Sequence, residues 1–348
     1  MSVEDKYIAT LVGTAVGDTL GMPVEAWKPE HIRKYIGRIT KLIAPVIPRG
    51  SSGNEVRRDE FGRIGYGFTR IFEKGDYTDD TILTLALAES IADKKCVDLK
   101  DVARHHVLAY EKQILPSGEV KGGFGSTTTQ AINNLRKGIP LTQSGIIGGP
   151  GNAPAMKMAP LGLYMNATGK YDEGLKQAED IGRITHLDPR SLASGVVQAH
   201  AVYSLLKVIS RNEFVESIAN VCRKNERPLT PELRAQEAGT LTDKIKWVAR
   251  NQGANAEEVY QHLKCSDLVT ESYPFALFMF QKYWDEPIEG LIETVNFGGD
   301  ADTTGAIYGA LCGAKNGMIF PEKWVKEIKN LEPIIRAGKG LYSLKKHR

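Results

Sequence analysis

The sequence predicts an all-α protein that folds as one compact helical domain. In ten segments the apolar residues recur every three or four positions, which places them on one face of an α-helix. Few segments alternate apolar and polar residues with a period of two, so β-structure is expected to be minor. A chain of 348 residues can bury a large core, and no linker separates two cores. Residues 1–348 are therefore predicted to form a single domain.

The first half of the chain has four predicted helices, separated by loops of distinctive composition. These helices cover residues 7–20, 81–92, 99–114 and 127–135. The helix at 81–92 follows a run of Thr and Asp that suits a helix N-terminus. Residues 45–76 form a long connection that contains Gly and Arg, and residues 121–126 are Gly-rich. Because long loops in compact domains are commonly functional, both loops are candidate parts of a site.

The second half of the chain has six predicted helices. They cover residues 171–184, 191–209, 213–222, 273–283, 289–295 and 304–314. Residues 145–160, which precede them, hold four Gly and three Pro and are predicted to be non-helical. Residues 211–264 are more polar than their surroundings and are a candidate peripheral insertion. The last helix, like the helix at 81–92, follows a run of Thr and Asp.

Charge and composition exclude several classes of protein. The 45 basic and 42 acidic residues give a net charge of +3, too small an excess for a dedicated nucleic-acid-binding protein. Nucleic acid is therefore expected only as a modified substrate. The four cysteines are far apart, and no apolar run reaches the ~18 residues of a membrane span. With no signal-peptide pattern at its start, the chain is expected to be a cytoplasmic monomer that has no membrane partner.

Two short acidic motifs stand directly before predicted helices. The first is GDYTDDT at residues 75–81, and the second is NFGGDADTTG at residues 296–305. Helix capping could explain either motif alone, because Thr and Asp accept hydrogen bonds from the first N–H groups of a helix. Together they bring four carboxylates and two threonines to two helix starts, which is more than capping requires. Adjacent carboxylates such as Asp79 and Asp80 repel each other unless a positive charge lies between them.

A divalent cation would relieve this repulsion. Carboxylates and Thr hydroxyls, without His or Cys, favour magnesium, calcium or manganese over zinc. If the two motifs meet in space, they can hold two ions with one carboxylate bridging them. Ions ~3.5–4 Å apart are the usual arrangement of two-metal catalytic sites.

These motifs resemble the two metal motifs of the ADP-ribosylglycohydrolases. A third motif, GTAVGDTLGMPVE at residues 13–25, resembles the opening motif of the same family. Shorter matches at residues 123–125, 151–157 and 185–186 follow in the family's order. The resemblance spans residues 13–317, which is nearly the whole chain.

The resemblance implies an all-α fold with a dinuclear magnesium site at its centre, where manganese is expected to substitute. The predicted metal ligands are the matching residues of the two acidic motifs, Thr78, Asp79, Asp80, Asp300, Asp302 and Thr303. The first motif and Asp302 are expected to hold one ion and the second motif the other, so that Asp302 bridges the two. Glu25 matches a glutamate implicated in catalysis in the family. Glu25 and Asp302 are therefore the predicted catalytic residues.

The resemblance also implies which residues contact ADP-ribose. The predicted substrate-binding residues lie in two Gly-rich loops and one Thr-His pair, namely Gly122, Gly123, Phe124, Gly125, Ser126, Gly148, Gly149, Gly151, Asn152 and His186. Backbone N–H groups in such loops can bind a pyrophosphate, although ordinary turns have the same composition. Gly149-Pro150 replaces a Ser-aromatic pair that is more usual in the family, and Ala153-Pro154 stands where glycine is common. An alternative role for His186 is to cap the helix that follows.

The predicted activity is magnesium-dependent hydrolysis of the glycosidic bond between ADP-ribose and an acceptor. The partner is then an ADP-ribosylated protein or small-molecule acceptor. Such cleavage passes through an oxocarbenium-like state, for which a carboxylate and a positioned water are suitable groups. Glu25 could transfer a proton, or it could be a solvated glutamate at a helix end. Asp18, in the same motif, is expected to support the site rather than to bind metal.

Two other functions use the same residues. One is a two-metal phosphohydrolase that acts on nucleotides, and the other is a non-catalytic ADP-ribose-binding member of the family. A binding protein would be expected to lack metal ligands, and all six candidates are present here. The sequence therefore favours an enzyme.

Glycine recurs every four residues in two of the predicted helices. Gly13, Gly17 and Gly21 form one series, and a second series runs from Gly305 to Gly317. Residues four apart share a helix face, and each interior Gly costs ~1 kcal/mol relative to Ala. Tight packing must offset that cost, so both helices are predicted to be buried at the centre with their glycine faces against close neighbours. Gly21 and Gly317 could instead cap helix ends.

Overall fold

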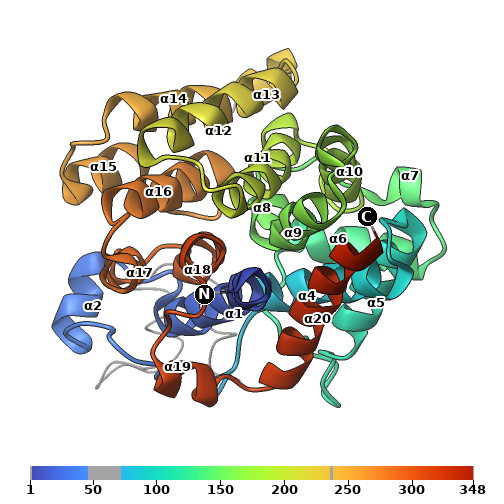
Figure 1. Ribbon diagram of the computed structural model, residues 1–348, viewed down its shortest axis with the longest axis horizontal. Coiled ribbons are helices and arrows are strands. Elements are labelled where there is room, and N and C mark those ends of the chain that lie inside the picture. The colour runs from blue at the N-terminus through green and yellow to red at the C-terminus, as the bar shows by residue number, and fades with distance from the viewer. Residues whose placement is uncertain (1, 46–71, 236–237, 348) are drawn as a thin grey trace.

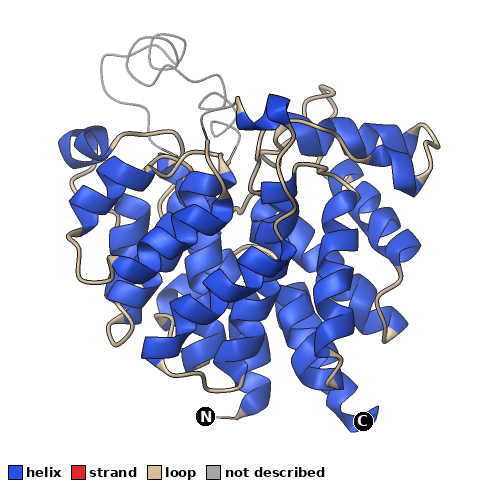
Figure 2. Cartoon of the chain, turned by 90° about the horizontal axis from the view of Figure 1, so that it is seen from above, coloured by secondary structure: helices blue, strands red, loops and turns tan. Residues whose placement is uncertain are grey.

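The computed structural model describes residues 2–45, 72–235 and 238–347. Most of the connection predicted at residues 45–76, namely residues 46–71, lies outside the described residues. The described residues form helices joined by loops, with isolated β-bridges but no strand (Figure 2). The prediction of an all-α fold is confirmed.

Each of the ten predicted helices is present, with ends that differ by a few residues. They are α1 (Val3–Gly21), α4 (Asp79–Lys94), α5 (Leu99–Glu111), α6 (Ser126–Arg136), α10 (Tyr171–Arg183), α11 (Pro189–Leu206), α12 (Arg211–Asn225), α16 (Val269–Lys282), α17 (Pro287–Asn296) and α18 (Ala301–Asn316). In α5, α6 and α10 the apolar face is buried and the opposite face is solvated, which explains why their periodicity was readable.

Further helices lie in segments that were not predicted to be helical, although α14, α15 and α20 also have one buried apolar face. They are η1 (Met22–Val24), α2 (Pro29–Tyr35), α7 (Leu141–Ser144), α8 (Ala153–Lys157), α9 (Ala159–Thr168), α13 (Pro231–Arg234), α14 (Leu241–Arg250), α15 (Ala256–Leu263), α19 (Glu322–Glu327), α20 (Leu331–Ser343) and η4 (Leu344–His347). The prediction that residues 145–160 are entirely non-helical is wrong. Pro154 and Pro160 stand in the first turns of α8 and α9, where a missing N–H group is tolerated.

Helices α1 and α18 pack against each other at the centre of the molecule (Figure 1). A Cβ atom added to Gly13 would lie 2.1 Å from the carbonyl oxygen of Gly309, and one added to Gly17 would lie 1.9 Å from that of Gly305. The two backbones are thus in direct contact, and every residue of α18 from Ala301 to Ala314 is buried. The prediction that both glycine faces are buried against close neighbours is confirmed, and the two faces are each other's neighbours.

The two terminal glycines of these series differ. Gly317 has a φ of +71° and forms the C-cap of α18, as predicted for a capping glycine. Gly21 has a helical φ of −82°, and a Cβ there would lie 2.1 Å from the carbonyl oxygen of Ala301. The suggestion that Gly21 is a cap is therefore wrong, because close packing is what requires glycine at this position.

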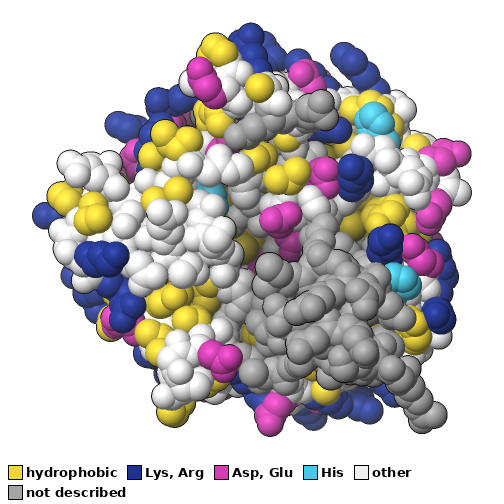
Figure 3. Space-filling model, turned by 180° about the vertical axis from the view of Figure 1, so that it is seen from behind, with side chains coloured by type: hydrophobic (Ala, Val, Ile, Leu, Met, Phe, Trp, Pro, Cys, Tyr) yellow, Lys and Arg dark blue, Asp and Glu magenta, His cyan; other side chains and the backbone are white. Residues whose placement is uncertain are grey.

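Residues 211–264 form α12 to α15 at one end of the molecule (Figure 1). Helix α12 packs on α11, and α14 and α15 pack on α16. The interpretation of this segment as an insertion stays a prediction. None of the described helices has the length and apolarity needed to cross a membrane. Among the described residues on the face drawn in Figure 3, Lys and Arg side chains are dispersed around the periphery.

Candidate functional site

The first acidic motif opens α4, and a carboxylate from another helix caps it. Asp18 of α1 accepts hydrogen bonds from the backbone N–H groups of Thr78, at 2.9 Å, and Thr81, at 3.0 Å. It also accepts from both threonine hydroxyls, at 3.0 and 2.6 Å. Because Asp18 satisfies the helix N-terminus, Asp79 and Asp80 are not required as caps. Asp18 thus has the supporting position expected from the sequence.

The second acidic motif is held against the loop that carries Glu25. The N–H of Gly299 donates to the carbonyl of Trp27 at 2.7 Å, and the N–H of Ala26 donates to the carbonyl of Gly299 at 2.6 Å. Gly299 has a φ of +62°, and a Cβ there would lie 2.4 Å from the carbonyl oxygen of Cys265. This backbone contact brings carboxylate oxygens of Glu25, Asp300 and Asp302 within 4.8 Å of one another.

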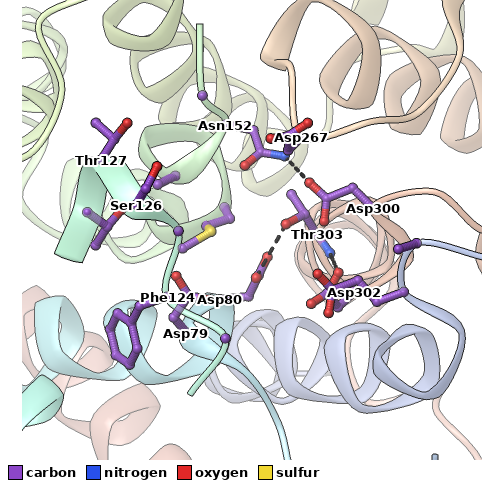
Figure 4. Close-up of a pocket in the computed structure, with 18 of the residues that line it drawn as sticks. Asp79, Asp80, Phe124, Ser126, Thr127, Asn152, Asp267, Asp300, Asp302 and Thr303 are labelled. Carbon is purple, nitrogen blue, oxygen red and sulfur yellow. Dashed lines mark hydrogen bonds between the residues drawn. The ribbon is translucent and has the colours of Figure 1, made fainter. Parts of the chain in front are cut away.

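One side-chain hydrogen bond connects the two motifs, and further bonds extend the cluster (Figure 4). The hydroxyl of Thr303, in the first turn of α18, donates to Oδ2 of Asp80 at 3.3 Å. Asp302 accepts from the backbone N–H of Thr303 at 3.0 Å. The Asn152 amide donates to Oδ2 of Asp300 and, at 3.0 Å, to the hydroxyl of Ser272. Residues more than 200 positions apart therefore form one polar cluster.

This cluster concentrates negative charge away from water. Burial raises the pKa of Asp80, and the nearby carboxylates of Asp302 and Asp18 raise it further. Burial likewise raises the pKa of Asp302 to about 7 and raises that of Glu25 well above its ordinary value. Oδ1 of Asp80 and Oε2 of Glu25 are buried without a hydrogen-bond partner among the described residues.

The donor set fits hard divalent cations. Unpaired carboxylate oxygens that face one another in a water-poor site need a compensating positive charge. Carboxylates with threonine hydroxyls are the ligands that magnesium or manganese prefers. The hydroxyl of Thr78 lies 3.1 Å from Oδ2 of Asp80, so Thr78 is close to the cluster even though it is fully buried behind it. The fit supports the expected metal site without identifying the ion.

A cavity of about 550 Å³ opens over the carboxylates. The predicted metal-site and catalytic residues that line it are Glu25, Asp79, Asp80, Asp300, Asp302 and Thr303. The predicted substrate-binding residues that line it are Gly123, Phe124, Gly125, Ser126, Gly151, Asn152 and His186. Its size is typical of a cavity that holds a small organic ligand. The cavity therefore joins the acidic cluster to parts of both Gly-rich loops.

Four predicted site residues do not line this cavity. Thr78 is buried, and Gly122 contributes its carbonyl oxygen to a 2.6 Å hydrogen bond from the N–H of Asp79. That bond attaches the Gly-rich loop to the metal motif. Gly148 lies next to the Thr127 side chain, and Gly149 is exposed to solvent.

His186 faces the cavity and does not cap the helix that follows. Asp188 is the N-cap of α11 and accepts from the N–H of Arg190 at 2.8 Å. Burial, together with the nearby charge of Lys157, lowers the pKa of His186 to about 3. The imidazole is therefore neutral near pH 7.

Several lining residues were not predicted from the sequence. They are Ala26, Thr127, Thr128, Ala153, Met156, Asp267 and Gly299. Asp267 is exposed on the loop before α16, and Figure 4 places it beside Asn152. Its sequence signal is an acidic residue just before an apolar helix, which is also present at the two metal motifs, but Asp267 has no second Asp beside it. Most of the others are small residues whose place in the cavity depends on the fold.

Known proteins are similar to this chain in sequence and in fold. A family model described as ADP-ribosylglycohydrolase matches residues 1–348. The chain is 24% identical to ADP-ribosylhydrolase ARH3 of Mus musculus, over 94% of this chain and 88% of that protein. It is 25% identical to ADP-ribosyl-(dinitrogen reductase) glycohydrolase of Rhodospirillum rubrum, over 94% of this chain and 91% of that protein. A solved structure named ADP-ribosylglycohydrolase-related protein complex has the same fold, with a TM-score of 0.62, 24% identity and 99% coverage of both chains.

Proposed function

The chain belongs to the ADP-ribosylglycohydrolase family, and on this basis we propose that it is a magnesium-dependent hydrolase that cleaves the bond between ADP-ribose and an acceptor. The named relatives from Mus musculus and Rhodospirillum rubrum are hydrolases of ADP-ribosyl groups. The observation that carries the proposal is the cavity in which Glu25, both acidic motifs and the Gly-rich loops meet.

The proposed metal ligands are the residues of the two acidic motifs. Asp79, Asp80 and Thr78 would hold one ion, Asp300 and Thr303 the other, and Asp302 would bridge them. Bound divalent cations would supply charge that orients ribose hydroxyls and polarises a water or the leaving group. Asp18 and Asn152 support this set, because their hydrogen bonds orient Thr78 and Asp300.

Glu25 is the proposed proton-transfer residue. Its Oε2 is buried, has no hydrogen-bond partner among the described residues, and lies in the carboxylate cluster. Burial and the neighbouring carboxylates raise the pKa of Glu25 when no cation is bound, so bound cations would favour the ionised carboxylate that can accept a proton. In the proposed reaction, Oε2 accepts a proton from water as the water oxygen bonds to the anomeric carbon. The bond from that carbon to the acceptor breaks with its electron pair on the acceptor atom, which takes up a proton from solvent water, and Glu25 returns its proton to solvent.

The Gly-rich loops are the proposed ligand-binding surface. No Lys or Arg is among the described residues that line the cavity. The phosphates of ADP-ribose would therefore be held by backbone N–H groups and neutral side chains of these loops, such as Ser126 and His186, rather than by ion pairs. Phe124 is fixed by an edge-to-face contact with Tyr110 and presents an apolar surface to the ligand.

A panel of ADP-ribosylated acceptors tests the proposed function. Substrates that carry ADP-ribose on arginine, serine, a base or a small metabolite are incubated with the protein in magnesium or in excess chelator, and products are identified by mass spectrometry. We expect free ADP-ribose and intact acceptor with magnesium and no release in chelator. Asp80→Ala should abolish the release, whereas Asp172→Ala, at an exposed acidic residue, should not.

Three results would contradict the proposal. Release of AMP or phosphate instead of ADP-ribose would indicate the alternative nucleotide phosphohydrolase. Binding of ADP-ribose without turnover of any acceptor would indicate a binding protein. Full activity in excess chelator would exclude a role for divalent cations.

A further inference from the structure

A lysine side chain is buried directly beneath the candidate site. Lys157, at the end of α8, is fully buried, although lysine is among the residues most rarely found inside proteins. Its Nζ donates a hydrogen bond to Oγ1 of Thr185 at 3.1 Å, which is its one hydrogen bond within the described residues. Buried polar groups are expensive unless they have partners, so this contact calls for an explanation.

Thr185 connects Lys157 to His186. Oγ1 of Thr185 lies 3.0 Å from Nδ1 of His186. The other ring nitrogen, Nε2, has no hydrogen bond within the described residues, and His186 lines the cavity. Nε2 also lies 3.0 Å from the position of a Cβ on Gly151, so it is close to the Gly-rich loop. The three side chains form a line from the buried core to the cavity.

The hydrogen positions in this line follow from the donors available. The lysine nitrogen donates to one of the two lone pairs of Oγ1, and the single hydroxyl hydrogen of Thr185 can be donated to a further acceptor. It can reach Nδ1 of His186 at 3.0 Å or the carbonyl of Gly182 at 3.5 Å, and the shorter contact is favoured. Nδ1 of the neutral imidazole then accepts, which leaves the ring proton on Nε2.

We propose that Lys157 is a positioning residue that acts through Thr185 to hold His186 in its Nε2–H tautomer. This N–H group donates to an oxygen of the nucleotide bound beside Gly151. The identity of that ligand rests on the proposed function, whereas the tautomer is a property of the free protein.

The tautomer matters because the cavity has few donors. Its described lining contains six carboxylates and no Lys or Arg, while ADP-ribose offers mainly oxygen acceptors. The Nζ–H groups of Lys157 beside Oγ1 repel a second donor, so removal of Lys157 favours the arrangement in which the Thr185 hydroxyl accepts from Nδ1–H and donates to Gly182. Nε2 would then present a lone pair, which repels an oxygen of the ligand.

Nitrogen-15 NMR of the histidine rings tests the tautomer directly in the free protein. Wild type should show His186 protonated at Nε2 and unprotonated at Nδ1. Lys157→Met and Thr185→Val, which remove the donor and the link with similar side-chain volumes, should move population to the Nδ1–H form. Lys170→Met, at a half-exposed lysine, is the control and should change nothing. Unchanged His186 signals in a folded Lys157→Met or Thr185→Val protein would overturn the proposal.

ADP-ribose binding, measured by calorimetry, tests the consequence. Lys157→Met and Thr185→Val should each weaken binding about tenfold, the usual effect of losing one hydrogen bond to a charged group. In a His186→Gln background, whose amide can donate in any state, Lys157→Met should cause little further loss. An equal loss of binding from Lys157→Met in the wild-type and His186→Gln backgrounds would overturn the proposal. So would weaker binding in Lys157→Met with normal binding in Thr185→Val, because that result would indicate an effect of the lysine charge alone.

The two measurements separate this inference from the proposed function. Failure of the wild type to bind ADP-ribose would contradict the proposed function, and the NMR experiment would still decide the tautomer. Normal ADP-ribose binding with His186 protonated at Nδ1 in the wild type would leave the proposed function intact and refute this inference.

Discussion

At the scale of single residues, the most informative side chain is Asp18. It accepts hydrogen bonds from Thr78 and Thr81, and so it takes over the capping of α4. Burial raises the pKa of Asp18 to about 6, while these hydrogen bonds lower it. Because Asp18 performs the structural task, Asp79 and Asp80 can keep lone pairs for another partner. The simple capping explanation of the first acidic motif is thereby weakened.

Replacing Glu25 tests its proposed role as proton-transfer residue. We expect Glu25→Gln to retain ADP-ribose binding and to lower kcat by ~10²–10⁴-fold, the usual contribution of a general acid or base. Calorimetry measures the binding, and product release measures kcat. As a control, Glu257→Gln on an exposed helix start should keep full activity. Wild-type turnover in Glu25→Gln would identify Glu25 as a structural residue.

The bridging assignment predicts unequal effects of two conservative substitutions. Asp302→Asn should reduce kcat/KM about tenfold more than Asp79→Asn does, a difference of about 1.4 kcal/mol, because only Asp302 is proposed to bind both ions. It should also require a higher magnesium concentration for half-maximal activity. Titration of activity against magnesium measures both effects. If the two variants showed equal and mild losses, Asp302 would not be a bridge.

At the scale of elements, the contact between α1 and α18 determines where the metal motifs lie. Glu25 follows α1 by four residues, and Asp300 and Asp302 stand at the start of α18. The glycine faces let the two backbones touch, so the end of α1 lies beside the beginning of α18. The glycines therefore contribute to the site although none of those in α1 or α18 lines the cavity.

Adding one methyl group to this interface should be strongly destabilising. A Cβ on Gly309 would lie 2.0 Å from the carbonyl oxygen of Gly13, and neither backbone can move without shifting a whole helix. We expect Gly309→Ala to lower the free energy of unfolding by about 3 kcal/mol or more, at the upper end for overpacked cores. Urea denaturation measures the change. Gly253→Ala, at an exposed glycine with open space around it, is the matched control. Equal stability of the two variants would contradict close backbone packing.

At the scale of the whole molecule, the acidic cluster links stability to cation binding. A ligand that binds only the folded state stabilises it by about 2.7 kcal/mol at a hundredfold excess over its Kd. We expect magnesium to raise the Tm measured by thermal denaturation and excess chelator to reverse the rise. Asp302→Ala should abolish this response, because the proposed bridging ligand is missing. A Tm that does not respond to magnesium in the wild type would argue against the site.

A second stability effect comes from His200, which connects three helices. Its Nδ1 lies 2.8 Å from the hydroxyl of Tyr171 in α10, and its Nε2 lies 2.7 Å from that of Ser217 in α12. Burial lowers the pKa of His200 from 6.5 to about 4. Between these pH values the unfolded chain binds a proton that the folded protein does not, so stability falls as the pH falls.

The variant His200→Gln isolates this effect. It should be less stable than wild type at pH 7.5, because side-chain hydrogen bonds are lost. The stability difference should shrink by about 1.4 kcal/mol per pH unit below pH 6.5, since the glutamine does not titrate. Urea denaturation of both proteins between pH 7.5 and 5 measures it, and comparison of the two cancels other titrating groups. A constant difference across this range would contradict the lowered pKa.

The sequence by itself determined the fold class and the residue types of the site. Amphipathic helices such as α10 were readable because one face is buried and the other is solvated. In α9 almost every side chain is buried, so no periodicity marked it as a helix. Helix α20 is different, because its buried residues Ile334, Ala337 and Leu341 have helical spacing and the signal was present but not recognised. Such local signals report solvent contrast along one helix and do not report long-range packing.

Only the tertiary structure decided how the site is assembled. The two acidic motifs could be recognised as similar, but their meeting depends on the hydrogen bonds of Asp18 in α1 with the start of α4 and on the backbone contact of α1 with α18. The line from Lys157 through Thr185 to His186 likewise joins α8 to the loop before α11. Distances between residues far apart in sequence follow from packing of the whole chain, which is why composition and spacing could name these side chains but not place them together.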